Sequence, residues 1–160
     1  MLAELVVIVP LASMSVGEEF ESGAGAIPLH MTVLTKVRVP RDQSVVAAVR
    51  AIAATTAPFN VVASGRAGFG HEGTVQVTTV EMSDPLRRLH LRLLDDVRRA
   101  GADPVQLAYN GDGYRPHVSD TRDGQLISPG ERLALTTLAI LDCSRPTRRL
   151  ADKVALSGTA

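Results

Sequence analysis

Two short segments constrain the fold most, because each places a histidine in a run of residues that is otherwise typical of a buried strand. The first is IPLHMTVL, residues 27–34, and the second is YRPHVSD, residues 114–120. In each segment a hydroxyl residue follows two positions after the histidine, which is His30 in the first and His117 in the second. Because the chain has only four histidines, the recurrence makes these two segments the first candidates for function.

Side-chain alternation predicts what each strand presents. Successive side chains of a strand point to opposite faces, so residues two positions apart share a face. Thr32 therefore lies beside His30, and Ser119 lies beside His117. The apolar residues between and around them point the other way and anchor the strand in a core. Each strand is thus expected to offer an imidazole and a hydroxyl on one face, roughly 7 Å apart at the backbone.

The remaining pattern predicts an α+β fold with mostly antiparallel strands. Residues 13–26 are polar and glycine-rich and predict a long loop. A tight turn around Gly70 and Gly73 predicts a hairpin between the strands on either side of it. Runs of strand-forming residues predict strands at 3–9, 29–39, 59–69, 74–82, 132–144 and 148–158, with weaker candidates at 105–108 and 117–121.

Apolar residues at helical spacing predict two helices. The first contains the stripe from Val45 to Ile52, and Pro58 ends it because the residue before a proline avoids the α conformation. The second begins with Asp84 as its N-cap, followed by a proline in its first position. Gly101 lies where the C-terminal cap of this helix belongs.

Composition limits the kind of partner. Lys plus Arg number 17 and Asp plus Glu number 17, so the formal net charge is zero. Proteins that bind long nucleic acids through many phosphates carry excess positive charge, so extensive duplex binding is not expected. Aromatic residues make up 3% of the chain and tryptophan is absent, which disfavours a broad base-stacking platform. We expect a monomer that makes a local contact with a small substrate.

The N-terminal apolar run does not resemble a signal peptide, because it is short, carries Glu4 in place of a basic residue and is interrupted by Pro10. A first buried strand is expected there. No run approaches the ~20 apolar residues of a membrane span, so we expect no membrane association and a cytoplasmic location. The single cysteine, Cys143, allows no disulfide within the chain and is expected in the core.

The two histidine segments resemble the paired motifs of the two-histidine (2H) phosphoesterase superfamily, which includes 2′-5′ RNA ligase-like proteins and 2′,3′-cyclic phosphodiesterases. That superfamily is defined by two His-x-Thr/Ser-apolar motifs, matched here by HMTV at residues 30–33 and HVS at residues 117–119, 87 positions apart. The segments APFNVVASGRAGF and YRPHVS are also similar to the family pattern, so the resemblance covers residues 3–157. One departure is Asp120, which stands where an apolar residue is usual.

The resemblance implies a two-lobed, pseudo-symmetric fold within one domain, residues 1–160, with sheets lining a central cleft and helices packed outside. It also implies a metal-independent phosphodiesterase without a cofactor, acting on a 2′,3′-cyclic phosphate or on small cyclic or 2′-5′-linked nucleotides. His30 and His117 would serve as general base and general acid, because an imidazole pKa of about 6.5 allows both forms near neutral pH. Thr32 and Ser119 would donate hydrogen bonds to the phosphate oxygens.

Three further residues are candidate substrate contacts, each with a structural alternative. Arg115 would help to neutralise the phosphate, or would remain a solvated surface residue. Tyr114 would pack against a nucleobase, or would fill the second lobe. Phe20, in the long loop before the first motif, would cover the ligand, or would anchor the loop. The other histidines are expected to be structural, His71 in an exposed turn and His90 at the boundary of the second helix's apolar stripe.

The sequence is also compatible with other functions. One is an RNA-end enzyme with 2′-5′ RNA ligase activity, for which Lys36 and Arg38 would supply a local basic strip. Another is a non-catalytic nucleotide-binding module that has kept the fold. A metal site built from His30, His117 and Asp120 lacks a recognisable ligand cluster. Asp120 would either raise the pKa of His117 or face solvent.

Overall fold

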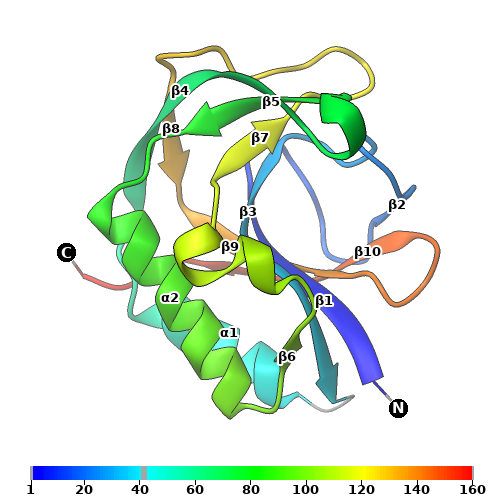
Figure 1. Cartoon of the computed structure of the whole chain (residues 1–160). Coiled ribbons are helices and arrows are strands. Elements are labelled where there is room, and N and C mark those ends of the chain that lie inside the picture. The colour runs from blue at the N-terminus through cyan, green and yellow to red at the C-terminus, as the bar shows by residue number, and fades with distance from the viewer. Residues whose placement is uncertain (1, 41–42, 160) are drawn as a thin grey trace.

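The computed structural model describes residues 2–40 and 43–159, which form two α-helices and ten β-strands, so the predicted α+β class is confirmed (Figure 1). None of the described helices is long and apolar enough to cross a membrane. The helices are α1 (Ser44–Ala54) and α2 (Asp84–Arg99). The strands are β1 (Leu2–Pro10), β2 (Glu19–Phe20), β3 (His30–Pro40), β4 (Phe59–Phe69), β5 (Val75–Val80), β6 (Asp103–Pro104), β7 (His117–Ser119), β8 (Arg132–Leu135), β9 (Thr137–Asp142) and β10 (Arg148–Ala155).

The strands join in one curled, antiparallel sheet. Their order is β2-β10-β9-β1-β3-β7-β5-β4-β8, and β6 pairs with β3 outside this path. Near the middle of the order, β3 pairs with β7 through one residue pair, Met31 opposite Val118. This narrow junction divides the sheet into two halves, and each half contributes one of the two histidine strands.

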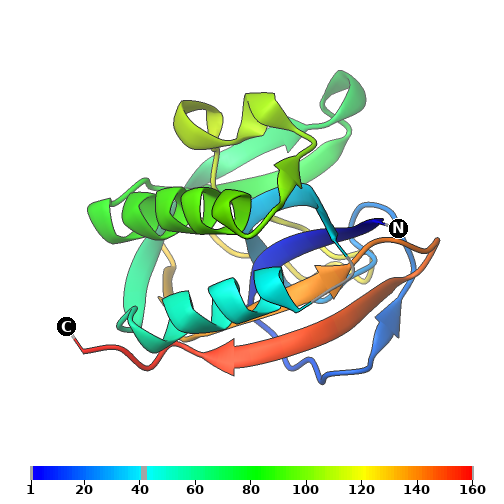
Figure 2. The same ribbon diagram turned by 90° about the horizontal axis from the view of Figure 1, so that it is seen from below.

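Both helices pack side by side against the same side of the sheet (Figure 2). Their buried apolar faces meet strands from both halves in one large core. Met31 and Val118 belong to this core and are 0% exposed, so the junction of β3 and β7 is apolar on its helix-facing side. The buried residues that α1 and α2 contribute to the core include Val45, Val49, Ile52, Leu86, Leu89, Leu93 and Val97.

The ends of α2 match the sequence prediction to within one residue. Ser83 is the N-cap, since its hydroxyl accepts a hydrogen bond from the backbone N–H of Leu86 at 3.4 Å. The prediction that Asp84 is the N-cap was therefore wrong by one position, because serine and aspartate are equally good caps and the local sequence does not rank them. Gly101 follows the last turn with φ of +102°, a conformation that favours glycine.

The predicted loop before β3 covers the other face of the first half of the sheet. A second apolar cluster forms there and includes Ile8, Met14 and Leu150. Phe20 lies in β2, which pairs with β10, and its partly buried ring packs against this cluster. Cys143 is buried in the same cluster, as predicted for a core residue.

Two strand predictions need correction. The candidate strand at 105–108 is wrong, because Leu107–Tyr109 forms a 3₁₀ turn and the local strand is the two-residue β6. Runs this short cannot be assigned by periodicity alone. The expected strand at 132–144 is two strands: β8 pairs with β4 and β9 pairs with β1, so the chain passes from the second half of the sheet to the first near Thr136.

Between its pairings with β7 and β6, the edge of β3 is bridged by side chains. The Tyr114 hydroxyl donates a hydrogen bond to the Thr32 carbonyl at 2.8 Å. The Thr35 hydroxyl donates to the side-chain oxygen of Asn110 at 2.9 Å. The Tyr114 bond gives a backbone carbonyl of β3 the partner that a neighbouring strand would otherwise supply, because a buried carbonyl without a partner is costly. The Thr35 bond ties β3 to the segment before β7 through side chains alone.

His90 completes the bridge and is not the boundary residue that the sequence predicted. Its ring is 1% exposed, its Nδ1 donates to the Val33 carbonyl at 2.7 Å, and its Nε2 accepts from the Gly111 backbone N–H at 2.9 Å. A carbonyl only accepts and an N–H only donates, so the ring is neutral with its proton on Nδ1. It stacks on Tyr114 with 4.0 Å between centroids and 9° between planes. Burial lowers the pKa of His90, which favours this neutral form.

Replacing Tyr114 with phenylalanine tests this bridge. Tyr114→Phe keeps the ring stacked on His90 but leaves the Thr32 carbonyl without its donor, so we expect the free energy of unfolding to fall by about 1–3 kcal/mol in urea denaturation. The matched control is Tyr109→Phe, which removes the hydroxyl of a residue that is 53% exposed and is expected to change stability little. Equal stability of the two variants would contradict the bridging role.

Candidate active site

Four side chains of the two histidine motifs lie on one face of neighbouring strands. Met31 and Val118 are directly opposite in the antiparallel pair of β3 and β7 and point into the helix-facing core. Continuing this register by one residue in each direction places one motif's histidine opposite the other motif's hydroxyl. The four side chains, all on the face turned away from the helices, are His30, Thr32, His117 and Ser119, and we call them the histidine–hydroxyl tetrad.

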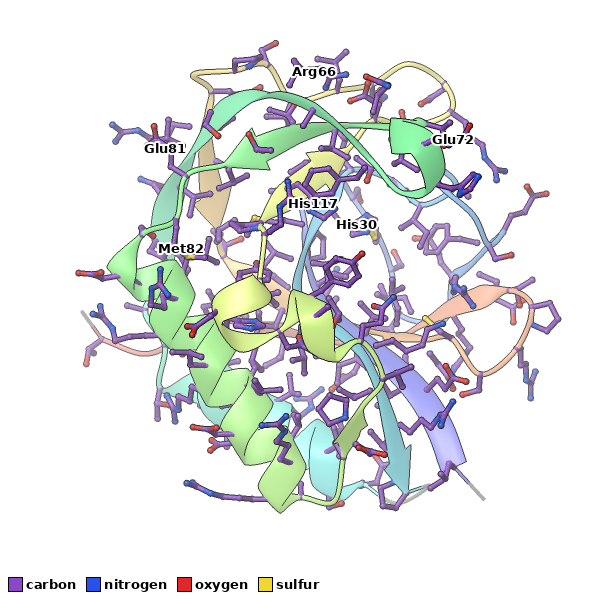
Figure 3. All side chains as sticks on the ribbon, viewed as in Figure 1. His30, Arg66, Glu72, Glu81, Met82 and His117 are labelled. Carbon is purple, nitrogen blue, oxygen red and sulfur yellow. The ribbon has the colours of Figure 1, made fainter. Side chains whose placement is uncertain are left out.

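The two imidazoles occupy diagonal corners of this tetrad. Diagonal neighbours of an antiparallel pair are about 7–8 Å apart at the backbone. Figure 3 shows His30 and His117 close together where β3 meets β7. The two rings are close enough to interact, because the His117 ring lowers the pKa of His30.

The two rings are held in the same way. Nδ1 of His30 donates to the Pro28 carbonyl at 2.8 Å, and Nδ1 of His117 donates to the Arg115 carbonyl at 2.7 Å. In both motifs the acceptor lies two residues before the histidine. Pro116 disfavours the α conformation at Arg115. Since a carbonyl cannot donate, Nδ1 carries the proton and Nε2 is the nitrogen free to react.

Both rings favour the neutral state. Burial is the largest cause that lowers the pKa of His30, and the nearby His117 ring lowers it further. Burial likewise lowers the pKa of His117, with an added contribution from the positive charge of Arg115. The hydrogen bonds to the backbone carbonyls oppose these shifts without reversing them. Each Nε2 is therefore an available base at neutral pH.

The two hydroxyls are also available to a ligand. Thr32 and Ser119 are half-buried, and within residues 2–40 and 43–159 neither side chain hydrogen-bonds to another protein group. A hydroxyl in this position can rotate to donate to an oxygen of a bound phosphate.

A stacked pair of side chains borders the tetrad beside His117. The Phe69 ring lies 4.4 Å from the His117 ring, centroid to centroid, with the planes tilted by 58°. The Arg115 guanidinium carbon lies 4.4 Å from the centroid of Phe69. Arg115 is thus held at the site by a cation–π contact. Sequence reasoning missed Phe69, because its contact with His117 depends on how the β4–β5 hairpin curls and no local pattern records it.

Tyr114 and Phe20 both pack against other protein groups. Tyr114 is 6% exposed, its hydroxyl is bonded to β3 and its ring is stacked on His90, so the geometry supports the packing alternative. Phe20 lines a cavity of about 630 Å³ between the loop before β3 and the loop after β7. The same ring packs against the second apolar cluster, so Phe20 both anchors its loop and faces this cavity.

Asp120 is bound by an arginine on the opposite face of β7. Arg66 donates to both carboxylate oxygens of Asp120, at 2.6 and 2.5 Å. Figure 3 shows Arg66 away from the two histidines, toward the rim of the second half of the sheet. Asp120 does not contribute to the shift of His117, whose pKa is lowered. No group of three or more metal-ligating side chains occurs among the residues that the structure describes.

Comparison with known proteins gives a family match over most of the chain. The model of the 2′-5′ RNA ligase superfamily matches residues 8–128, which include both histidine motifs. No curated protein matches the sequence.

Several solved structures share the fold over nearly the whole chain. Protein TT0787 of Thermus thermophilus is 18% identical with a TM-score of 0.63, covering 98% of this chain and 100% of that one. E. coli LigT in its apo form is 18% identical with a TM-score of 0.61, covering 98% and 99%. A structure described as a phosphoesterase is 17% identical with a TM-score of 0.57, covering 97% and 98%. LigT has also been solved in complex with 3′-AMP and with phosphate.

The state of the two rings is open to direct measurement. We expect His30 and His117 to titrate below the value of about 6.5 seen in model peptides, because burial and a nearby cationic or imidazole group disfavour the charged form. Ring ¹⁵N NMR against pH reports both the midpoint and the tautomer, and His30→Ala and His117→Ala assign the signals. A midpoint above 6.5, or a neutral ring with its proton on Nε2, would contradict this description.

Proposed function

This chain belongs to the 2′-5′ RNA ligase superfamily, and on that basis we propose that it is a metal-independent phosphodiesterase acting on a 2′,3′-cyclic phosphate or on small cyclic or 2′-5′-linked nucleotides. The observation that carries the proposal is the pair of imidazoles on β3 and β7, each tied to its own backbone through Nδ1 and, among the described residues, without a hydrogen-bond partner at Nε2. The 3′-AMP complex of LigT supports a nucleotide as the substrate.

In the proposed hydrolysis, one imidazole is neutral and the other is protonated. The neutral ring takes a proton from water as the water oxygen forms a bond to phosphorus. The bond from phosphorus to the departing ribose oxygen breaks, and the protonated ring gives its proton to that oxygen. After turnover the two rings have exchanged protonation states, and proton exchange with solvent restores them. General acid and base catalysis of this kind contributes roughly 10²–10⁴-fold for each group.

The remaining groups of the site would stabilise the negative charge of the phosphate. Thr32 and Ser119 are placed to donate hydrogen bonds to the non-bridging oxygens, where negative charge increases in the transition state. Arg115 adds positive charge beside His117 and is held there by Phe69. These donors are fixed on strands or by stacking, so they need little reorganisation during the reaction.

Ligation at an RNA end would use the same two rings, with an RNA hydroxyl as the nucleophile in place of water. The basic strip that such a substrate would need is partly neutralised, because Lys36 pairs with Glu4 at 3.5 Å. Hydrolysis of a small substrate is therefore the function that we propose first.

A panel of 2′,3′-cyclic mononucleotides and of 2′-5′ and 3′-5′ dinucleotides, each with and without EDTA, separates hydrolysis, ligation and a metal requirement.

Removing either ring tests the assignment of the catalytic pair. We expect His30→Ala and His117→Ala each to lower kcat by at least ~100-fold, and the double variant to fall little further because the two rings act as a unit. His71→Ala is the matched control, since that side chain is 92% exposed. Circular dichroism checks that each variant is folded. Wild-type turnover in both single variants would refute the assignment.

The pH dependence of turnover tests the same pair without mutation. The profile of kcat/KM against pH reports the free enzyme and should be bell-shaped, with its maximum midway between the two ring pKa values. Since both pKa values are lowered, we expect this maximum below about 6.5. The measurement uses a 2′,3′-cyclic mononucleotide, whose single phosphodiester charge does not titrate in this range. A maximum above 6.5 would be inconsistent with two imidazoles of lowered pKa.

A further inference from the structure

The hydroxyl residues of the two motifs have different neighbours on the face turned away from the histidines. In the first motif the flanking residues are Met31 and Val33, and both are 0% exposed in the apolar core. In the second motif Ser119 lies between Val118, which is also 0% exposed, and Asp120. Alternation places Asp120 on the same face as Val118. The second motif therefore has a charged residue where the first has an apolar anchor.

The segment that carries Ser119 has a short strand pairing. Strand β7 pairs with β3 through one residue pair and with β5 through three. Beyond Ser119, the Asp120 backbone N–H donates to the Gln76 carbonyl at 3.0 Å, which continues the pairing with β5 by one step. The direction of the Ser119 side chain therefore depends on how firmly the residues on either side of it are held.

Arg66 holds Asp120 by reaching across the sheet. It lies on β4 directly opposite Thr78 of β5, and Thr78 lies directly opposite Val118 of β7. From there the Arg66 guanidinium donates to both carboxylate oxygens of Asp120, at 2.6 and 2.5 Å. A two-pronged bond of this kind fixes the orientation of the carboxylate as well as its distance.

The same guanidinium is bonded to the strand between β4 and β7. Arg66 donates to the Thr78 hydroxyl at 2.7 Å, and this hydroxyl donates to the Ile127 carbonyl at 2.5 Å. Thr78 is 0% exposed, and the Arg66 and Asp120 side chains are 35% and 22% exposed. One arginine thus ties three adjacent strands together, and solvent reaches the ion pair only in part.

We propose that Arg66 is a positioning residue of the active site, which acts through Asp120 to hold the Ser119 hydroxyl where it donates to the phosphate. The inference rests on the proposed function for the role of Ser119. Figure 3 shows Arg66 apart from both imidazoles, so it acts on the reaction through the residues that it holds. The Arg66–Asp120 pair gives the second motif the anchor that Val33 gives the first. Precise anchoring matters, because a misplacement of about 1 Å can cost ~10²-fold in rate.

Arg66→Met tests this role, since it keeps an unbranched side chain and removes the guanidinium. Because the Ser119 hydroxyl acts on charge that develops in the transition state, we expect kcat for a 2′,3′-cyclic mononucleotide to fall by about tenfold and KM to change by less than about twofold. The matched control is Arg50→Met, which breaks a similar two-pronged pair with Asp152, at 2.8 and 2.6 Å, between α1 and β10. The control should leave kcat unchanged.

A second mutation distinguishes positioning from a general loss of structure. In a Ser119→Ala background there is no hydroxyl to misplace, so Arg66→Met should lower kcat further by less than about twofold. Asp120→Asn keeps the size of the side chain and removes its charge, and it should show the same dependence on Ser119 with a smaller effect. Equal effects of Arg66→Met with and without Ser119 would overturn the proposal, as would wild-type kcat in Arg66→Met.

Amide hydrogen exchange tests the anchor without substrate, and so separates this inference from the proposed function. The Asp120 amide should exchange about tenfold faster in Arg66→Met than in the wild-type protein, and at the wild-type rate in Arg50→Met. This result, together with a wild-type protein that hydrolyses no cyclic phosphate, would sink the proposed function and keep the anchor. Hydrolysis by the wild-type protein, with exchange and kcat unchanged in Arg66→Met, would do the reverse.

Discussion

The arrangement of the site depends on one contact, the pair of Met31 and Val118 at the junction of β3 and β7. Moving a strand by one residue turns each of its side chains to the other face of the sheet. Burial of these two residues in the helix-facing core fixes the register and so fixes the opposite face. The two histidines face the same side because their neighbours are buried together, so the hydrophobic effect sets the face on which they lie, and the hydrogen bonds at Nδ1 set the orientation of each ring.

Because β3 and β7 pair over so short a stretch, the β3 edge needs other partners, and these are the side chains of Tyr114, Asn110 and His90. The histidines of this chain differ in how many of their ring nitrogens are bound by the protein. His90 has protein partners at both ring nitrogens and is locked as a structural element. Among the described residues, His30 and His117 each have a hydrogen-bond partner at Nδ1 alone, which leaves Nε2 free for chemistry. The number of ring nitrogens satisfied by the protein, together with burial, separates His90 from His30 and His117.

Sequence reasoning predicted the features of the fold that depend on local sequence pattern. Alternation placed each hydroxyl on the face of its histidine, and apolar runs located the main strands and both helices, because these features follow from backbone geometry within a few residues. The features that sequence reasoning missed join distant segments. Asp120 is bound by Arg66, 54 residues earlier, and Phe69 reaches His117 through the curl of a hairpin. Such contacts follow from the closure of the whole sheet, which no short pattern encodes.

The proposed reaction also requires that two similarly held rings take different roles, and the substrate itself supplies the asymmetry. In the free protein both rings favour the neutral form, since burial lowers the pKa of each. A phosphodiester anion bound between them favours a positive charge on the ring that it contacts, which raises the pKa of that ring. Phosphate binding and protonation of one imidazole therefore strengthen each other, by the reciprocity that links any two binding equilibria. The ring that gains the proton is the acid, and the ring that stays neutral is the base.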